Sequence, residues 1–330
     1  MAQSLPQRAL GKSGINCSAI GLGCMSFSGT YGPSDDAAAV TLINQALDAG
    51  ITMLDSSDAY GKGQNETLVG NAIKSRRKDV MLATKFGNLG GAGGKYADGR
   101  PEFVASSCEA SLKRLGVDVI DLYYAHRSDP AVPIEDTVGA MAKLVQQGKV
   151  RALGLSEAAP KTIARAHKVH PIAAVQNEFS LLYREQADDT RKTTRDLGIS
   201  FVAYAPLGRG LLTSDIADPA TLSEGDTRKR QPRYAGDNLA HNRMLAQKVE
   251  AIAKRKGCTP AQLALAWVLA QGPDVIPIPG TKQLKRVQEN IGALNVKLSD
   301  ADLKEIASAI PAGAVKGTRY PEAQMASLYI

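Results

Sequence analysis

Short apolar runs alternate along the chain with longer segments in which apolar residues recur three and four positions apart. Short continuous apolar runs are typical of strands buried on both faces, and the three-and-four spacing is typical of helices with one buried face. The strand pattern occurs in residues 19–22, 51–54, 80–83, 119–124, 150–155, 173–176, 200–204 and 274–278. The helical pattern occurs in residues 37–49, 101–115, 134–147, 160–169 and 184–197. A short hairpin, residues 8–10 and 15–17 around the turn 11–14, is predicted before the first strand.

Glycines mark the points where predicted helices end and strands begin. Gly50, Gly116, Gly148 and Gly198 stand at such points, where a left-handed C-cap favours glycine. Alternation of strands and helices over this length predicts a closed parallel (β/α)8 barrel, a TIM barrel. We see no internal repeat or linker, so one domain over residues 1–330 is expected. The rival fold, an open doubly wound sheet, normally carries Gly-x-Gly-x-x-Gly after its first strand; residues 21–26 lack the third glycine and a clear helix after it.

Three segments interrupt the alternation. They are the glycine-rich residues 87–99, the polar residues 206–237 and the terminal residues 311–330. Long segments without regular structure in a compact domain are usually functional or disordered. In a barrel they lie at, or can fold over, the C-terminal face, where barrel enzymes have their active sites.

Composition narrows the class of protein. The chain is 44% hydrophobic and 22% charged, which is enough apolar material for a sizeable core. Its net charge of +7 is spread along the chain, and the only dense basic cluster, residues 228–233, lies in a polar segment. A nucleic-acid binder would concentrate that charge in a stripe with aromatic residues between. Residues 1–10 contain no apolar run, and the most apolar segment, 261–270, is too short to span a bilayer.

The cysteine and histidine positions indicate neither disulfides nor a metal site. Cys17, Cys24, Cys108 and Cys258 are far apart and form no Cys-x-x-Cys pair, so a zinc cluster is not expected and a reducing cytoplasm fits. The only close histidine pair, at positions 167 and 170, precedes a proline and lacks an acidic partner at metal-binding spacing.

Polar residues that could perform chemistry follow three neighbouring strands. Asp55 and Tyr60 follow the second strand, Lys85 ends the third, and His126 ends the fourth. A tyrosine has an ordinary pKa near ~10, and a nearby ammonium favours its phenolate. Lys85 can therefore lower the pKa of Tyr60, with Asp55 holding Lys85 in place. His126 can donate to a carbonyl oxygen, so that the set would polarise a C=O and protonate the resulting alkoxide.

These motifs resemble the aldo-keto reductase superfamily. The resemblance rests on residues 54–61 (LDSSDAYG), 83–87 (ATKFG) and 121–126 (DLYYAH), and extends from the hairpin to about Asn290. It implies Tyr60 as general acid, Lys85 and Asp55 as its tuning pair, and His126 as the donor that orients the carbonyl. It also implies a nicotinamide cofactor, NADPH/NADP+, bound without a doubly wound domain.

The same resemblance implies a set of cofactor-binding residues. Ser156, Glu157 and Gln176 would lie at the carboxamide, with Tyr204 stacked on the nicotinamide ring. The pyrophosphate would lie under Pro206, Leu207, Gly208, Arg209, Gly210 and Leu211. The adenosine end would contact Gly280, Thr281, Lys282, Arg286, Glu289 and Asn290. Lys282 and Arg286 are four apart, which would put them on one helix face; they are the expected ligands of the 2′-phosphate.

Two positions depart from the pattern of the family. Glu157 stands where many relatives have Asn, and a carboxylate cannot donate to the carboxamide oxygen. Gly280 stands where some relatives have a phosphate-binding Lys, a role that would pass to Lys282. Both departures resemble a bacterial and plant subgroup with a Gly-Leu-Ser-Glu motif.

The expected activity is NADPH-dependent reduction of an aldehyde or ketone, with a small carbonyl compound as the partner. Met25, Phe27, Tyr31, Phe86 and the loop 87–99 are expected to line an apolar substrate pocket. Two alternatives remain open: the reverse alcohol dehydrogenase reaction, and a regulatory nicotinamide-binding subunit with slow turnover. A metal-dependent hydrolase would need clustered ligands such as His-x-His after the first strand, and the sequence has none there. Oligomeric state stays open.

Overall fold

A computed structural model describes residues 4–215 and 218–330. Residues 1–3 and 216–217 lie outside the described residues. The prediction of one domain over residues 1–330 includes both segments, and the predicted long loop 206–237 includes the second.

Eight parallel strands form one sheet in the order β10-β9-β8-β7-β6-β5-β4-β3. The strands are β3 (Leu22–Gly23), β4 (Met53–Asp55), β5 (Met81–Phe86), β6 (Ile120–Ala125), β7 (Val150–Ser156), β8 (Ile172–Glu178), β9 (Ser200–Tyr204) and β10 (Val275–Pro277). Two hydrogen bonds join the first strand to the last: Gly21 N donates to Pro277 O (2.9 Å) and Gly23 N to Pro279 O (3.3 Å). The sheet therefore closes on itself, and the predicted (β/α)8 fold is confirmed.

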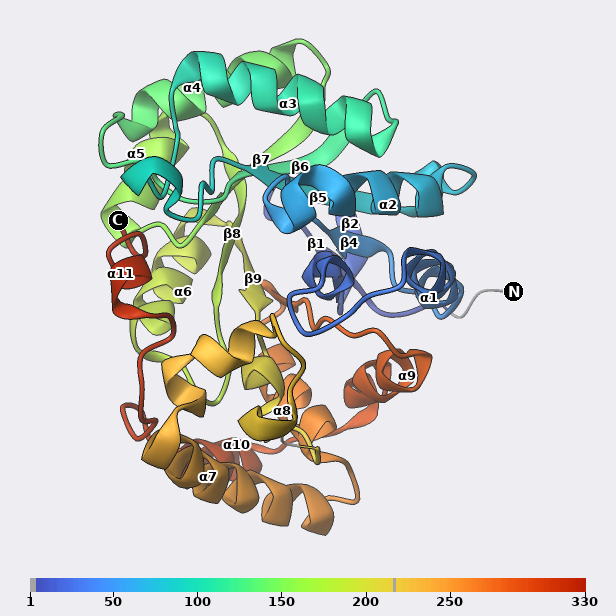
Figure 1. The fold of residues 1–330 in the computed structure, drawn as a ribbon, viewed down its shortest axis with the longest axis vertical. Coiled ribbons are helices and arrows are strands. Elements are labelled where there is room, and N and C mark those ends of the chain that lie inside the picture. Colours follow the sequence, from blue (N-terminus) through green and yellow to red (C-terminus); the bar gives the residue numbers. More distant parts are fainter. Residues whose placement is uncertain (1–3, 216–217) are drawn as a thin grey trace.

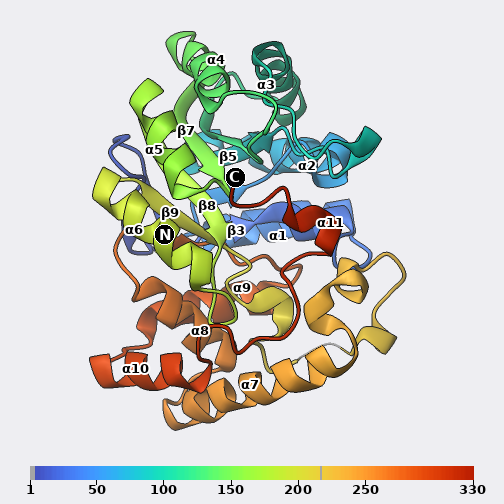
Figure 2. The same ribbon diagram turned by 90° about the vertical axis from the view of Figure 1, so that its left-hand side faces the viewer.

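Helices surround the barrel in chain order (Figures 1 and 2). They are α1 (Asp36–Asp48), α2 (Gln64–Ile73), α3 (Pro101–Leu115), α4 (Ile134–Gln146), α5 (Pro160–Val169), α6 (Glu185–Leu197), α7 (Gly236–Arg255), α8 (Pro260–Leu269), α9 (Leu284–Gly292), α10 (Asp300–Ala309) and α11 (Glu322–Met325). Local signals set several ends. Asp35 accepts from Ala38 N at the start of α1, and Thr259 forms a capping box with Gln262 at the start of α8.

The hairpin closes the N-terminal end of the barrel. Its strands, β1 (Gln7–Ala9) and β2 (Asn16–Ser18), pair antiparallel. Gly11 N donates to Ser200 Oγ at the start of β9 (2.8 Å), and a Cβ on Gly11, whose φ is +54°, would lie 2.6 Å from Ala173 O. Leu10 and Ile15 pack with side chains of the barrel interior. With this end filled, the opposite, C-terminal end is the one that can receive a ligand.

The main departure from the predicted elements is at the first strand. Residues 19–22 were expected in a strand, but β3 is only Leu22–Gly23, because Ala19 N bonds Pro6 O and Ala19 and Ile20 pack against Leu265 of α8. The other predicted strands shift by at most three residues at either end. The predicted loop 206–237 holds short 3-10 turns and the first turn of α7, and the terminal segment 311–330 includes α11.

The terminal segment crosses the molecule. It leaves α10 in the lower half of Figure 1, passes α6 and ends near α5, and Figure 2 shows the same path from the side. Backbone hydrogen bonds fix its last residues: Ala159 N donates to Ile330 O (2.9 Å) and Tyr329 N to Glu157 O (2.7 Å). We call residues 311–330 the tail. Among the described residues, none of the helices has the length and apolar character needed to cross a membrane.

Candidate active site

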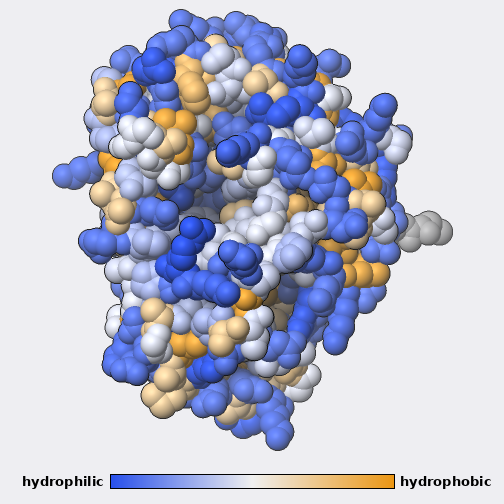
Figure 3. Space-filling model, in the orientation of Figure 1, coloured by the Kyte–Doolittle hydropathy of each residue, from blue (hydrophilic) through white to orange (hydrophobic). Residues whose placement is uncertain are grey.

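A cavity of about 1070 Å³ opens at the C-terminal ends of the strands. Figure 3 shows the hollow on this face, bordered mainly by hydrophilic side chains. The strand ends β4 and β6 to β10 contribute to its wall, as do the loops after β5 and β9 and the tail. The three irregular segments predicted to fold over the active face therefore all reach this cavity: Leu89 from the first, Arg228 from the second and Tyr320 from the tail line it.

Lys85 connects the predicted catalytic residues. Its side chain is fully buried, and its Nζ donates to Asp55 Oδ1 (2.5 Å), Ser56 O (2.6 Å) and Tyr60 OH (3.3 Å). Parallel pairing of β4 with β5 brings the ends of these strands together, and Asp58 N bonds Lys85 O just beyond β4. Tyr60 is thereby held over the end of β5, where it lines the cavity with Asp55.

The electrostatics of Tyr60 differ from the sequence-based expectation. Burial raises the pKa of Tyr60 above its ordinary value, and Lys85, which lowers it, offsets only part of that effect. Burial also acts to lower the pKa of Lys85, but Asp55 and then Tyr60 outweigh it, so that the pKa of Lys85 lies above its ordinary value. The expectation of a lowered tyrosine pKa is wrong as a net result. At neutral pH Tyr60 keeps its proton and Lys85 its charge.

His126 lies beside Tyr60, with ring centroids 5.9 Å apart in an edge-on arrangement. Its Nδ1 is 3.0 Å from Ser57 Oγ. Burial, then the charges of Arg127 and Lys85, lower the pKa of His126 well below its ordinary value, so that the ring is neutral. When Ser57 donates to Nδ1, the proton of the ring is on Nε2, and His126 can donate a hydrogen bond into the cavity.

Ser156 and Gln176, at the ends of β7 and β8, both line the cavity. Gln176 Nε2 donates to Asp55 Oδ2 (2.8 Å), which ties the predicted carboxamide site to the predicted catalytic residues. Ser156 Oγ accepts from Arg127 Nη1 (3.4 Å). Arg127, which directly follows His126, was not predicted at the site; it is buried and lines the same cavity.

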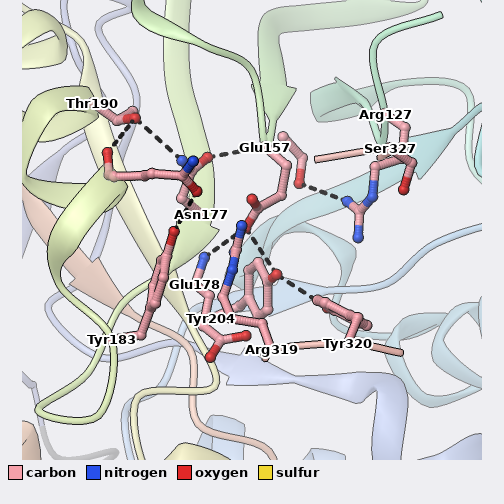
Figure 4. Close-up of polar contacts among 12 residues, drawn as sticks. Arg127, Glu157, Asn177, Glu178, Tyr183, Thr190, Tyr204, Arg319, Tyr320 and Ser327 are labelled. Carbon is pink, nitrogen blue, oxygen red and sulfur yellow. Dashed lines mark hydrogen bonds and ion pairs between the residues drawn. The ribbon is translucent and has the colours of Figure 1, made fainter. Parts of the chain in front are cut away.

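Glu157 is directed away from the cavity. Its Oε1 accepts from Arg319 Nη1 (2.8 Å), Tyr204 OH (2.8 Å) and Glu178 N (2.9 Å), as Figure 4 shows in part. It does not line the cavity, and both members of the ion pair with Arg319 are buried. The expectation that Glu157 contacts a carboxamide is not supported by this geometry, because its carboxylate holds the tail instead.

Tyr204 and Tyr320 form one wall of the cavity, with their hydroxyl oxygens 3.0 Å apart. Tyr204 ends β9, as predicted. Tyr320 comes from the tail and was not foreseen, since no motif in residues 311–330 indicates a contact with a distant strand. The only sequence signal was the unusual acid at position 157, which in this structure is neutralised by Arg319.

The basic residues expected at a phosphate do not share a helix face. α9 begins at Leu284, so Lys282 precedes it, and Lys282 Nζ donates to Tyr31 O (2.8 Å), Gly32 O (3.3 Å) and Pro33 O (2.8 Å). Arg286 lies on α9 and pairs with Glu289 (2.6 Å) and Asp215. Both basic residues line the cavity. Lys282 and Arg286 do not share a helix face because α9 starts later than the motif suggested.

Most other predicted cofactor residues reach the cavity. Those that line it are Pro206, Leu207, Arg209, Gly210, Gly280, Thr281, Glu289 and Asn290. Gly208 and Leu211 do not: a Cβ on Gly208 would lie 2.4 Å from Leu182, and Leu211 is in the core. At Gly280 a Cβ would lie 2.9 Å from Gly23 O, so close backbone approach explains why no lysine occupies the position.

Part of the set predicted to line a substrate pocket lies at the cavity. Met25, Tyr31 and the loop residues Asn88 to Gly90 line the cavity. Phe27 and Phe86 do not, because both are buried in the layer between strands and helices, where Phe86 stacks on Tyr123 with centroids 5.0 Å apart. Asp58, which sequence analysis did not propose, lines the cavity instead.

The cavity has the properties that a dinucleotide requires. Its volume exceeds the roughly 300–1,000 Å³ usual for a small ligand. Its lining includes the hydroxyl of Tyr60, the aromatic ring of Tyr204 and the cation of Arg286. In residues 4–215 and 218–330, no group of three or more His, Cys, Asp or Glu side chains could hold a metal ion.

Comparisons with known proteins agree with this geometry. A family model described as "Aldo/keto reductase family" matches residues 19–311. A probable aldo-keto reductase 1 of Glycine max is 48% identical over 314 residues, 94% of this chain and 90% of that protein. Two solved structures superpose on the chain. A glycerol dehydrogenase from Gluconobacter oxydans has a TM-score of 0.81, 28% identity and coverage of 92% and 94% of the two chains. An aldo/keto reductase from Klebsiella pneumoniae in complex with NADP and acetate has a TM-score of 0.73, 25% identity and coverage of 96% and 99%.

Proposed function

The chain belongs to the aldo/keto reductase family, and from this we propose that it uses NADPH to reduce an aldehyde or ketone to the alcohol, with Tyr60 as the proton donor. Membership makes it an oxidoreductase of carbonyl and alcohol groups. The proposal that Tyr60 donates the proton rests on one observation: the fully buried Lys85 contacts both Asp55 and Tyr60 at the cavity wall.

Each residue of this group has a defined task. Lys85 and Asp55 orient the phenol of Tyr60, and the raised pKa of Tyr60 keeps it protonated at neutral pH. His126, neutral and supported by Ser57, donates to the carbonyl oxygen and positions it. As negative charge develops on that oxygen, Tyr60 transfers its proton to it.

NADPH supplies the hydride when it is bound. We propose that Ser156 and Gln176 hold its carboxamide, with Tyr204 against the ring, and that Pro206, Leu207, Arg209 and Gly210 lie over the pyrophosphate. At the adenosine end, Gly280, Thr281, Lys282 and Arg286 would contact the phosphate, and Glu289 and Asn290 the adenine. Gly208 and Leu211 pack beneath the segment 206–211 without lining the cavity, and Glu157 binds Arg319 of the tail.

The reverse reaction uses the same residues and is the second candidate, favoured by the likeness to a glycerol dehydrogenase. Alcohol oxidation requires Tyr60 as a phenolate. Because the pKa of Tyr60 is raised, oxidation should become appreciable only in alkaline solution. The four free cysteines are consistent with action in a reducing cytoplasm, which we also propose.

The test is NADPH oxidation against a panel of aldehydes, ketones and keto-sugars, with alcohol oxidation measured in parallel. NADPH fluorescence reports binding independently of turnover. Tight NADPH binding with no turnover on any compound would favour the regulatory alternative, and the absence of NADPH binding would remove the proposal.

A further inference from the structure

Arg127 is a buried cation in the wall of the active site. It directly follows His126, is 9% exposed and lines the cavity. Its Nη1 donates to His126 O (2.6 Å) and Ser156 Oγ (3.4 Å), both uncharged acceptors. Although burial alone would lower its pKa, neighbouring acidic groups, Tyr320 first, raise the pKa of Arg127 above its ordinary value. The guanidinium is therefore charged at every physiological pH.

This arginine differs from the other buried arginines around the tail. Arg209 and Arg233 pair with Glu178, and Arg319 pairs with Glu157. Within residues 4–215 and 218–330, Arg127 has no carboxylate partner in an ion pair. Figure 4 shows it lying apart from the Glu157–Arg319 pair. These four buried arginines are thus accompanied by only two buried glutamates, Glu157 and Glu178. Such an excess of buried positive charge is costly unless a further anion binds.

The carboxylates nearest the reacting end do not supply that anion. Asp55 is bonded to Lys85 and Gln176. Burial, then Glu66, raises the pKa of Asp58 to about 6, and the cation that acts on it is Arg114 of α3. Neither residue is hydrogen-bonded to Arg127 within the described part of the chain, and Arg127 lines the cavity.

We propose that Arg127 binds an anionic oxygen group, such as a carboxylate, on the carbonyl substrate, and that the preferred substrates are negatively charged aldehydes or ketones. The inference rests on the proposed function and names the substrate class of that site. A guanidinium suits this task because its fixed fork of donors matches the two oxygens of a carboxylate.

The topology separates this site from the proposed phosphate site. Arg127 follows β6, whereas Lys282 and Arg286 follow β10. In the closed sheet, β6 and β10 are four strands apart in either direction, so they stand on opposite sides of the barrel. An anion at Arg127 is therefore close to Tyr60 and His126, on the reacting molecule, and not at the far end of the dinucleotide.

The first experiment measures binding without turnover. Benzoate and its neutral analogue benzamide are titrated by calorimetry into the protein saturated with NADP+. Wild type should bind benzoate at least about tenfold more tightly than benzamide, the scale of a charge-assisted pair. Arg127→Met should remove that preference, and Arg127→Lys should retain part of it. Arg151→Met removes the same charge from an exposed arginine that pairs with the buried Asp121 and does not line the cavity, and it should retain the full preference.

The second experiment compares kcat/KM for the three carboxybenzaldehydes with their methyl esters. At least one acid should exceed its ester about tenfold in wild type, and Arg127→Met should reduce that ratio of acid to ester to within about threefold.

Either of two results overturns the inference: wild type that binds benzoate and benzamide equally, or Arg127→Met that weakens NADP+ and both analogues alike. The second result would assign Arg127 to the cofactor pocket. If benzoate is preferred through Arg127 but no carbonyl compound oxidises NADPH, the anion site stands and the proposed reductase function fails.

Discussion

Arg319 of the tail and Glu157 at the end of β7 form a buried ion pair, with Nη1 and Oε1 2.8 Å apart. The same carboxylate oxygen accepts from Tyr204, and Tyr204 contacts Tyr320. One acidic residue therefore connects the tail to the aromatic wall of the cavity. A change at position 157 should affect both stability and the shape of the site.

Glu157→Gln should destabilise the protein by about 3–5 kcal/mol, because it leaves Arg319 buried without a counter-charge. Chemical denaturation measures the change. Glu157→Met combined with Arg319→Met should cost less than the sum of the two single variants, since no unpaired charge remains. Arg165→Ala, which breaks the exposed pair with Glu135, is the control and should leave the midpoint nearly unchanged. Equal effects of Glu157→Gln and Arg165→Ala would show that the buried pair is unimportant.

Tyr60→Phe should lower kcat by about two to four orders of magnitude, the scale of a lost general acid, while the Kd for NADPH stays within about twofold. Lys85→Met should behave similarly. Steady-state kinetics and NADPH fluorescence separate the two quantities. Near-normal turnover by Tyr60→Phe would assign the proton to another group.

The raised pKa of Tyr60 makes a prediction about the pH profile of reduction. A tyrosine whose pKa is lowered would lose its proton, and reduction would slow, between neutrality and the ordinary tyrosine value near ~10. Because burial raises the pKa of Tyr60 beyond the effect of Lys85, kcat for carbonyl reduction should stay level up to that value. A decline with a midpoint near neutral pH would contradict the electrostatics described here.

His126 should contribute to the pH dependence of stability. Its pKa is well below the ordinary value in the folded protein, chiefly through burial. Below about pH 6.5, His126 therefore binds a proton in the unfolded chain but not in the folded protein. The contribution of His126 to the free energy of unfolding is thus fully present above that pH, and it is lost as the pH falls towards the folded-state pKa. In thermal denaturation, wild type should lose more Tm between pH 8 and pH 5 than His126→Gln. Parallel losses in the two proteins would mean that His126 is charged when folded.

Cofactor selectivity should depend on Arg286. Arg286→Ala should weaken NADPH by about ten- to hundredfold and NADH very little, because only NADPH carries the 2′-phosphate. Asp215→Asn should strengthen the binding of NADPH, since Asp215 forms an ion pair with the guanidinium of Arg286 in this structure. Both effects should shrink at high salt. Fluorescence titrations at two salt concentrations provide the measurement, and equal weakening of both cofactors by Arg286→Ala would assign that residue to the fold or to the adenine.

The barrel and the meeting of several polar strand-end residues could be predicted because each depends on local sequence. The end of β9 at Tyr204 was placed to the residue, and strand-end positions were enough to bring Asp55, Lys85 and His126 together. These features follow from hydrophobic periodicity and from the rule that parallel strands present their carboxyl ends on one face. That the chain forms one domain stays a prediction.

The features that were missed depend on long-range packing. The partner of Glu157 is 162 residues away, and no local pattern connects positions so distant. The net pKa of Tyr60 required knowledge of burial, which sequence spacing does not provide. Lys282 was placed on a helix that begins two residues later, and helix boundaries are where sequence patterns are least informative.

The hairpin that closes the barrel has a consequence for the order of folding. Gly11 N bonds Ser200 Oγ, and that hydroxyl donates to Ala9 O, so these contacts join segments about 190 residues apart in the chain. Closing so long a loop costs entropy that only an assembled partner surface can offset. The surface that receives Leu10 and Ile15 exists only once β8 and β9 have joined the sheet. The native state should therefore be preceded by a folding intermediate in which the N-terminal end of the barrel is still open and its apolar side chains are exposed. Hydrophobic dyes should bind to it transiently during refolding.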